Sequence, residues 1–269
     1  YEQRLYFFDR SDANDGNAKG VARFVFTNDD EENKLAADYL EFDNDNDDYM
    51  YAYKLLFDSS IEYTNTTSHP PGEDLEDTVV KIQGNDYTIT DVQGTSYAKK
   101  FTLLAGETIK WLQQGKTLTR TVSGVEHETE VTDVNDAENM CGVSVDGDTV
   151  WIDKGNTQSI NGVTIGVTDA VAVHAQLQDV DICKINVGAR EIIIDDGKQV
   201  KVDGVKIEGS IGTVLKGTGG SSGDTALWNG LYVTYVPDDE EYVPVGGSIQ
   251  DPIFGNFEIR FDSVSKETE

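Results

Sequence analysis

The sequence has few of the residues that build compact metal and redox sites. Its 269 residues include two cysteines, three histidines and five prolines. Two cysteines without a Cys-x-x-Cys pair or a Cys/His cluster argue against a structural zinc site. No apolar run approaches the ~18 residues that a transmembrane helix needs, so we expect no membrane span in this chain. No charged-then-apolar leader opens it, and we expect a mature protein or a fragment of one.

Catalytic motifs are missing as well. The chain has no Gly-x-Ser-x-Gly elbow, no P-loop and no His-Glu-x-x-His motif. His69 precedes two prolines, and His127 and His174 lie in strand-like patterns, so we interpret all three as structural. Paired carboxylates would suit a secreted hydrolase, but fifty acidic residues offer a pair at some spacing in any case. The sequence therefore predicts a protein that is not an enzyme.

Negative charge is what the chain has in excess. Fifty Asp and Glu residues against 21 Lys and Arg residues give a formal net charge of −29. Such a surface repels nucleic acids and anionic lipids, so we expect neither as a partner. It is tolerated at high salt, where screening weakens the self-repulsion, or where Ca²⁺ neutralises carboxylates directly.

Short runs that alternate between apolar and polar residues dominate the sequence and predict half-buried antiparallel strands. These runs cover residues 21–26, 50–57, 78–82, 87–92, 117–122, 143–145, 162–167, 171–177, 182–187, 191–194, 200–202, 231–236 and 257–261. Tight hairpin turns are predicted at Asp146-Gly147, Asn161-Gly162, Asp196-Gly197 and Asp203-Gly204. One short helix or turn is predicted over 30–40, and 98–104 is interpreted as a strand.

Two polar stretches, 64–77 and 216–224, have the composition of linkers and suggest how the strands are grouped. We predict an all-β fold of two β-sandwich, immunoglobulin-like domains. The outer domain would combine residues 1–75 and 216–269, and the central domain, 76–215, would be inserted into it or follow it.

Several motifs occur in a characteristic order along the chain. They are DYMYAYKLLF at 48–57, VVKIQGNDYTITDV at 79–92, LLAGE at 103–107, VSVDG at 143–147, KINVGA at 184–189 and DPIFGNFEI at 251–259. In this order, on an acidic chain with few helix signals, they resemble segments of archaeal surface-layer (S-layer) proteins. The resemblance extends from about residue 20 to residue 262. It implies a secreted lattice subunit of tandem β-sandwich domains, often glycosylated and often stabilised by metal ions.

The sharpest chemical feature is the run Asp-Asn-Asp-Asn-Asp-Asp at 43–48, whose alternating oxygens suit a Ca²⁺ ion. The run lacks the central glycine and the flanking helices of an EF-hand, so we reject that motif. A solvated acidic turn is the alternative interpretation. The predicted Ca²⁺ ligands are Asp43, Asp45, Asp47 and Asp48 and, in a second acidic loop, Asp12 and Asp15.

Three further residues are candidates for covalent modification. Asn65 opens the Asn-Thr-Thr sequon at 65–67 in a polar stretch, and we predict glycosylation there if the protein is secreted. Cys141 and Cys183 lie in separate strand-like runs, so a disulfide between them and two buried free thiols are both open.

Our leading hypothesis is an extracellular structural subunit, or a fragment of one, of a cell-surface S-layer. Its partners would be other copies in a lattice, bridged by cations, together with other cell-surface proteins. The alternative is a secreted carbohydrate-binding or adhesin-like module with structural calcium. Trp111, Trp151 and Trp228 would have to form its sugar-binding face, but we expect these rings to pack in the core.

Overall fold

The fold is all-β, as the sequence predicts, and its strands form several antiparallel sheets. A computed structural model describes residues 2–7, 21–27, 35–42, 49–66, 68, 70–94, 97–105, 108–122, 125–175, 178–217, 225–238 and 241–263. Within these ranges the one α-helix is α1 (Gly72–Leu75), and a short 3₁₀ helix, η2, covers Asp136–Glu138. None of the described helices is long and apolar enough to cross a membrane.

Two facing sheets enclose the larger hydrophobic cluster, which we call the first core. One sheet has the order β1 (Glu2–Phe7), β4 (Tyr51–Thr64), β20 (Thr225–Tyr235), β19 (Ser210–Lys216). The other has the order β18 (Val205–Lys206), β17 (Lys201–Val202), β16 (Arg190–Asp195), β7 (Lys100–Ala105), β6 (Asn85–Gln93), β5 (Val79–Ile82). The ring of Trp228 from the first sheet stacks on Phe101 from the second with centroids 4.5 Å apart. We call these two sheets and their core the first lobe.

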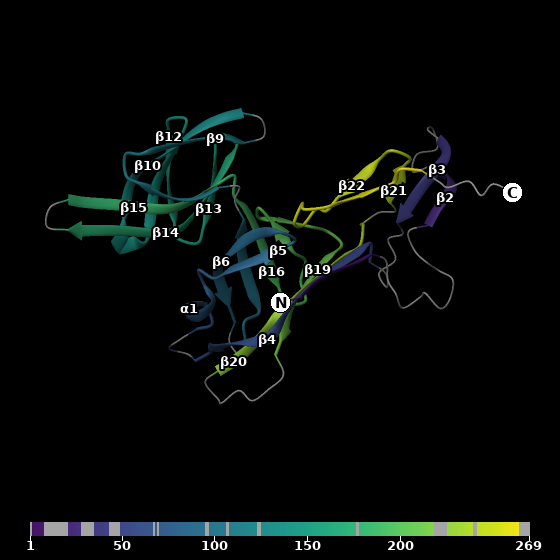
Figure 1. Ribbon diagram of the computed structural model, residues 1–269, viewed down its shortest axis with the longest axis horizontal. Helices are drawn as coiled ribbons and strands as arrows, with labels where there is room; N and C mark the ends of the chain where they lie inside the picture. Colours follow the sequence, from purple (N-terminus) through teal and green to yellow (C-terminus); the bar gives the residue numbers. More distant parts are fainter. Residues whose placement is uncertain are drawn as a thin grey trace.

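A second pair of sheets encloses a smaller cluster, the second core. One sheet has the order β13 (Thr157–Ile160), β14 (Val163–Ala175), β15 (Gln178–Val187), β8 (Thr108–Gln113). The other has the order β12 (Asp148–Asp153), β11 (Met140–Val145), β10 (Val125–Asn135), β9 (Thr117–Val122). Buried Val131 and Val143 from one sheet belong to the same cluster as Ile165 and Ile185 from the other. In Figure 1 these strands lie together, apart from β4 and β20. We call them the second lobe.

Two small sheets complete the chain beside the first lobe. One has the order β2 (Val21–Thr27), β3 (Leu35–Phe42), β21 (Glu241–Pro244), and the other pairs β22 (Ser248–Gln250) with β23 (Glu258–Arg260). The helix or turn predicted over 30–40 is therefore wrong for residues 35–40, which lie in β3. Leu and Ala favour a helix only weakly, and β3 hydrogen-bonds to strands on both sides, so tertiary pairing overrides the local preference.

The two cores draw on different parts of the chain, and the predicted domain boundaries of 76–215 stay a prediction. The second core uses residues 112–187 alone, whereas the first uses segments on both sides of it, including 80–103 and 192–214. Within the polar stretch 64–77, Leu75 is 2% exposed and belongs to the first core. The stretch 216–224 connects β19 and β20, which are neighbours in one sheet.

Most of the predicted hairpin turns form as expected. Both residues of Asp146-Gly147, Asn161-Gly162 and Asp203-Gly204 have positive φ, as a two-residue hairpin turn requires. At Asp196-Gly197 only the glycine does. The Asp196 carboxylate instead accepts hydrogen bonds from the Tyr97 hydroxyl and from the backbone N–H of Val214, so this residue connects the two sheets of the first lobe.

The lobes meet at a packed junction. Thr102 and Leu104 point away from the first core, because Phe101 and Leu103 alternate with them and point into it, yet they are only 5% and 1% exposed. Leu104 lies directly against Gly166 of β14, where an added side chain would collide with it. The segment that leads from β15 in the second lobe to β16 in the first is also fixed here. The backbone N–H of Ala189 in this segment donates a 2.8 Å hydrogen bond to the carbonyl of Thr164 in β14.

An ion-pair bridge closes one side of the junction. Lys154 belongs to the β12–β13 turn of the second lobe, and its Nζ lies 3.6 Å from Asp169 of the same lobe. The same Nζ lies 3.1 Å from Asp77, which follows α1 in the first lobe. Partial burial lowers the pKa of Lys154, but the two carboxylates outweigh it and the net shift is upward. One lysine therefore forms an ion pair with a carboxylate from each lobe.

Candidate functional site

The six predicted Ca²⁺ ligands lie outside the described residues. Asp12 and Asp15 precede β2, and the 43–48 run connects β3 to β4. Within the described part of the chain, no group of three or more His, Cys, Asp and Glu side chains is arranged to hold a metal ion. The calcium sites therefore stay a prediction from the sequence.

Asn65 lies directly after the last residue of β4, and its side chain is partly exposed. The backbone beside it is anchored, because the N–H of Thr64 donates to the carboxylate of Asp74 in α1 at 2.6 Å. The end of the strand next to Asn65 is therefore held in place. Its glycosylation stays a prediction.

Cys141 and Cys183 form a disulfide, which decides between the two alternatives that the sequence leaves open. Cys141 is in β11 and Cys183 is in β15, so the bond crosses the second core from one sheet to the other. Both residues are fully buried, and their Cα atoms are 6.4 Å apart. Such bonds are typical of proteins that fold outside the cytoplasm.

The three tryptophans do not form one surface. Trp228 is 1% exposed in the first core, as predicted, but Trp111 and Trp151 are 50% and 46% exposed. Their neighbours Leu112 and Ile152 face the second core, so the two exposed rings project outward from its two different sheets. The expectation that all three rings pack in the core is wrong for these two, because alternation places them on the solvent faces.

Of the histidines, His127 has a defined hydrogen-bond contact. Its Nδ1 lies 2.7 Å from Asp146 Oδ2, and the other oxygen of Asp146 accepts the backbone N–H of Glu128 at 2.9 Å. The hydrogen bond from Glu128, followed by the one with His127, lowers the pKa of Asp146. This pair secures the β11–β12 turn against β10, which fits the structural role that we expected.

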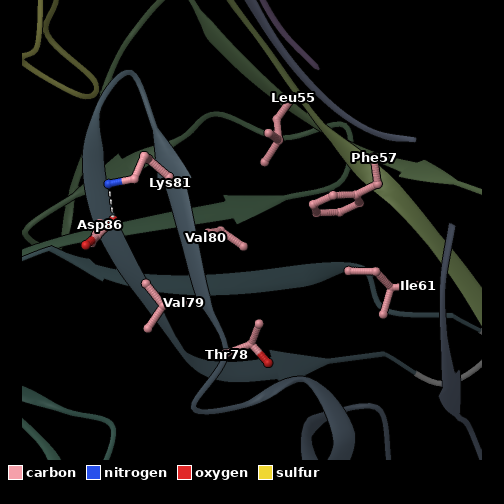
Figure 2. Close-up of a pocket in the computed structure, with 8 residues that line it drawn as sticks. All are labelled: Leu55, Phe57, Ile61, Thr78, Val79, Val80, Lys81 and Asp86. Atoms are coloured by element: carbon pink, nitrogen blue, oxygen red, sulfur yellow. Dashed lines mark ion pairs between the residues drawn. The ribbon is translucent and has the colours of Figure 1, made fainter. Parts of the chain in front are cut away.

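A first hollow, of about 280 Å³, opens between β4 and the edge strand β5. Figure 2 shows Leu55, Phe57 and Ile61 facing it from β4, with Val79 and Val80 on the hairpin opposite. The ion pair between Lys81 and Asp86, 2.6 Å long, closes one end. Nearby, the Gln3 side chain donates to the carbonyl of Lys81 and accepts the N–H of Gln83, which covers part of the edge of β5.

A second and larger hollow, of about 600 Å³, lies where the β5–β6 hairpin, the end of β7, the start of β16 and the 251–256 loop meet. Asn85 Nδ2 donates to Asn256 Oδ1 at 2.6 Å, and Asn256 Nδ2 donates to the Tyr87 hydroxyl at 3.3 Å. Arg190 reaches in from β16, and its Nη2 donates to the carbonyl of Pro252 at 2.8 Å. We call this space the Arg190 hollow.

Asp251 holds the loop that forms one wall of the Arg190 hollow. Its carboxylate is 3% exposed and accepts the backbone N–H groups of Ile253, Phe254 and Gly255, at 2.9, 3.1 and 3.2 Å. It also accepts the hydroxyl proton of Tyr51. Burial, followed by the charge of Asp251, raises the pKa of Tyr51. The carboxylate is therefore fully engaged in fixing the loop.

The Arg190 hollow was not found from the sequence, because its residues are spread from 84 to 256 and no spacing rule joins them. A signal was present in the motif segments 79–92, 103–107, 184–189 and 251–259, each of which supplies a residue that lines the hollow. A scan against protein-family models and a search of curated proteins find no match to this chain. Function is therefore argued from the residues and their geometry.

Proposed function

We propose that this chain is a non-catalytic structural module of an archaeal S-layer, built from immunoglobulin-like β-sandwich domains at the cell surface. The observation that carries the proposal is the packed junction between the lobes, where Thr102 and Leu104 are buried although they point away from the first core. A lattice can extend only if each subunit presents its contact surfaces at a fixed angle. Two lobes joined through buried side chains meet that requirement better than two lobes on a free linker.

The charge supports the same proposal. Copies that each carry a net charge of −29 repel one another at low ionic strength, so a lattice of them needs cations between its subunits. The predicted ligands Asp12, Asp15, Asp43, Asp45, Asp47 and Asp48 would supply carboxylates for Ca²⁺. The buried disulfide and the accessible Asn65 suit an extracellular, glycosylated subunit.

Negative-stain electron microscopy of the concentrated protein tests the proposal. We expect ordered sheets or patches in Ca²⁺ that disperse in EDTA at the same ionic strength. In the same buffers, EDTA should lower the melting temperature, since an ion bound only by the folded state adds about 2.7 kcal/mol at a hundredfold excess over its Kd. A chain that stays monomeric at every salt and Ca²⁺ concentration would contradict the proposal.

A pair of matched variants shows whether the predicted loop binds the ion. Asp43→Asn with Asp45→Asn should abolish the effect of Ca²⁺ on melting. Glu126→Gln with Asp148→Asn removes the same amount of charge from exposed positions of the second lobe. This control pair should preserve the effect of Ca²⁺ on melting. Equal responses of both variants to Ca²⁺ would place the ion elsewhere.

A carbohydrate-binding or adhesin-like module is the second candidate, and the exposed rings of Trp111 and Trp151 favour it. Because these rings project from different sheets, a sugar would stack on one of them at a time. Binding on a glycan array that is lost in Trp111→Ala or Trp151→Ala, with no sheets in the microscope, would support this function over a lattice.

A further inference from the structure

We propose that the Arg190 hollow receives a carboxylate side chain from a second copy of this chain. This deepens the lattice function proposed above and rests on it. The proposal names the place where one copy holds another, in addition to any cation that bridges them.

Arg190 has no ion pair among the described residues. Its one hydrogen-bond acceptor is the neutral carbonyl of Pro252, and no described carboxylate lies within ion-pair distance of the guanidinium. Nε is buried without a partner, whereas Nη1 has no acceptor and is not among the buried unpartnered atoms, so it reaches the hollow. Hydrogen bonds between a guanidinium and a carboxylate are among the strong ones in proteins.

Tyr87 provides a second donor in the same hollow. Its oxygen accepts the amide of Asn256, so its own proton is left for another acceptor. Burial raises the pKa of Tyr87, although the hydrogen bond from Asn256 opposes the shift, so the hydroxyl keeps its proton at neutral pH. A carboxylate that enters beside Arg190 would therefore find a second proton donor in the wall of the same hollow.

The carboxylates already near the hollow do not occupy these donors. Asp251 is held by three backbone N–H groups and by Tyr51. Asp86 also lines the hollow and is paired with Lys81 at 2.6 Å. Both are engaged elsewhere, so the free N–H of Arg190 remains available to a carboxylate from outside.

Charge complementarity identifies the source of that carboxylate. The chain has 50 acidic residues against 21 basic ones, so acidic side chains are the commonest charged groups that a second copy presents. The volume of about 600 Å³ accommodates a whole Asp or Glu side chain with its backbone. An arginine without an ion pair of its own is then a suitable point of attachment between copies that otherwise repel one another.

Sedimentation velocity of the full chain, at fixed Ca²⁺ and ionic strength, tests the inference. Arg190→Gln should raise the Kd of self-association about tenfold or more, because it removes a charge-assisted hydrogen bond. Lys206→Gln, an exposed residue of β18, makes the same change in net charge and should alter the Kd less than about twofold.

Arg190 also holds the 251–256 loop, so a second variant must separate a folding defect from lost docking. Asn85 is exposed and lines the hollow, so Asn85→Tyr should fill part of it, leave Arg190 in place and weaken association as Arg190→Gln does. Asn85→Ala removes the hydrogen bond to Asn256 without filling the hollow, and as the matched control it should weaken association less. Circular dichroism must show each variant folded.

The outcomes are distinct. If the unmodified chain does not associate at all, the lattice function fails and this inference with it. If it associates, and both hollow variants associate equally well, this inference alone is wrong. If association is unchanged but glucuronate binds the unmodified chain and not Arg190→Gln, the hollow holds an acidic sugar and docking between copies is wrong.

Discussion

The two cores reach the same sheet-on-sheet arrangement with different side chains. The first core is aromatic, with Trp228, Phe101, Tyr51 and Tyr87 among its buried members. The second, over its described residues, contains only aliphatic side chains and the two cysteines. Aromatic rings bury a large area each, so the first core gains more from each residue. The second is smaller and carries the covalent bond between its sheets.

The comparison teaches where a cross-link is useful. The first core gathers segments far apart in the chain, so it depends on many long-range contacts that form together. The second core is one continuous segment, in which a disulfide between residues 42 apart restricts the unfolded chain directly. We expect the second lobe to depend on its disulfide and the first on its rings.

The largest effect should follow from removing the central ring of the first core. Trp228→Ala should cost about 3–5 kcal/mol of unfolding free energy, because it removes a buried indole that stacks on Phe101. Denaturant unfolding should then show the first lobe melting early. The fluorescence of Trp111 and Trp151 in that variant reports the second lobe alone, which should unfold later. Trp111→Ala is the control and should cost much less, since its ring is half exposed. Equal losses of unfolding free energy in Trp228→Ala and Trp111→Ala would contradict the proposed role of aromatic rings in the first core.

Replacing Cys141 and Cys183 together by alanine should have the next largest effect, about 2–4 kcal/mol, confined to the second lobe. Trp228 fluorescence, in a background with Trp111→Phe and Trp151→Phe, reports the first lobe. The denaturant midpoint reported by Trp228 should stay unchanged, while the amide hydrogens of β11 and β15 in the second lobe should exchange faster. A shift of both lobes by the same amount would mean that they unfold as one cooperative unit.

A smaller effect is expected at the junction, where the two lobes meet. Lys154→Met should cost about 0.5–1 kcal/mol, because its ion pairs with Asp77 and Asp169 are partly exposed. Hydrogen exchange at the amide of Ala189 should increase, and added salt should reduce the difference. Lys198→Met breaks an exposed pair with Asp195 within the first lobe and should leave that amide unchanged. If both variants behave alike, Lys154 does not hold the lobes together.

The smallest effect concerns Glu191, which pairs across the sheet with Leu104 beside the junction. Burial, followed by the charge of Asp203, raises the pKa of this carboxyl. A raised pKa means that the folded protein holds the proton more tightly than the unfolded chain, so Glu191 costs stability above that pKa. The cost disappears as the pH falls toward the unfolded value of about 4.3.

Glu191→Gln should therefore stabilise the protein near neutral pH, by less than about 0.5 kcal/mol after solvent screening. Unfolding curves at a series of pH values should converge with those of the unmodified chain as the pH falls. Glu208→Gln, at an exposed site, is the control. A gain that grows on acidification would have the wrong sign for this explanation.

The sequence predicted best what depends on neighbouring residues. Alternation located strands such as β9 (Thr117–Val122), and Asx-Gly pairs located turns such as Asp146-Gly147, since both signals act within a few residues. The same local signals misjudged residues 35–40, because β3 gains partners on both sides that the local sequence does not reveal. The positions of Trp111 and Trp151 were predicted wrongly. Alternation shows which residues share one face of a strand, but it does not show which of the two faces another sheet covers.

Composition and local pattern alone determined an acidic, all-β chain with tight hairpins and two cysteines able to pair, because charge, alternation and turn chemistry are properties of short segments. Only the tertiary structure decided which strands share a core, that Cys141 and Cys183 lie opposite each other, and that Leu104 is covered by Gly166. It alone brought Arg190 to Tyr87 and Asn256. These contacts join residues separated by tens to hundreds of positions, and which of them form depends on how whole sheets stack.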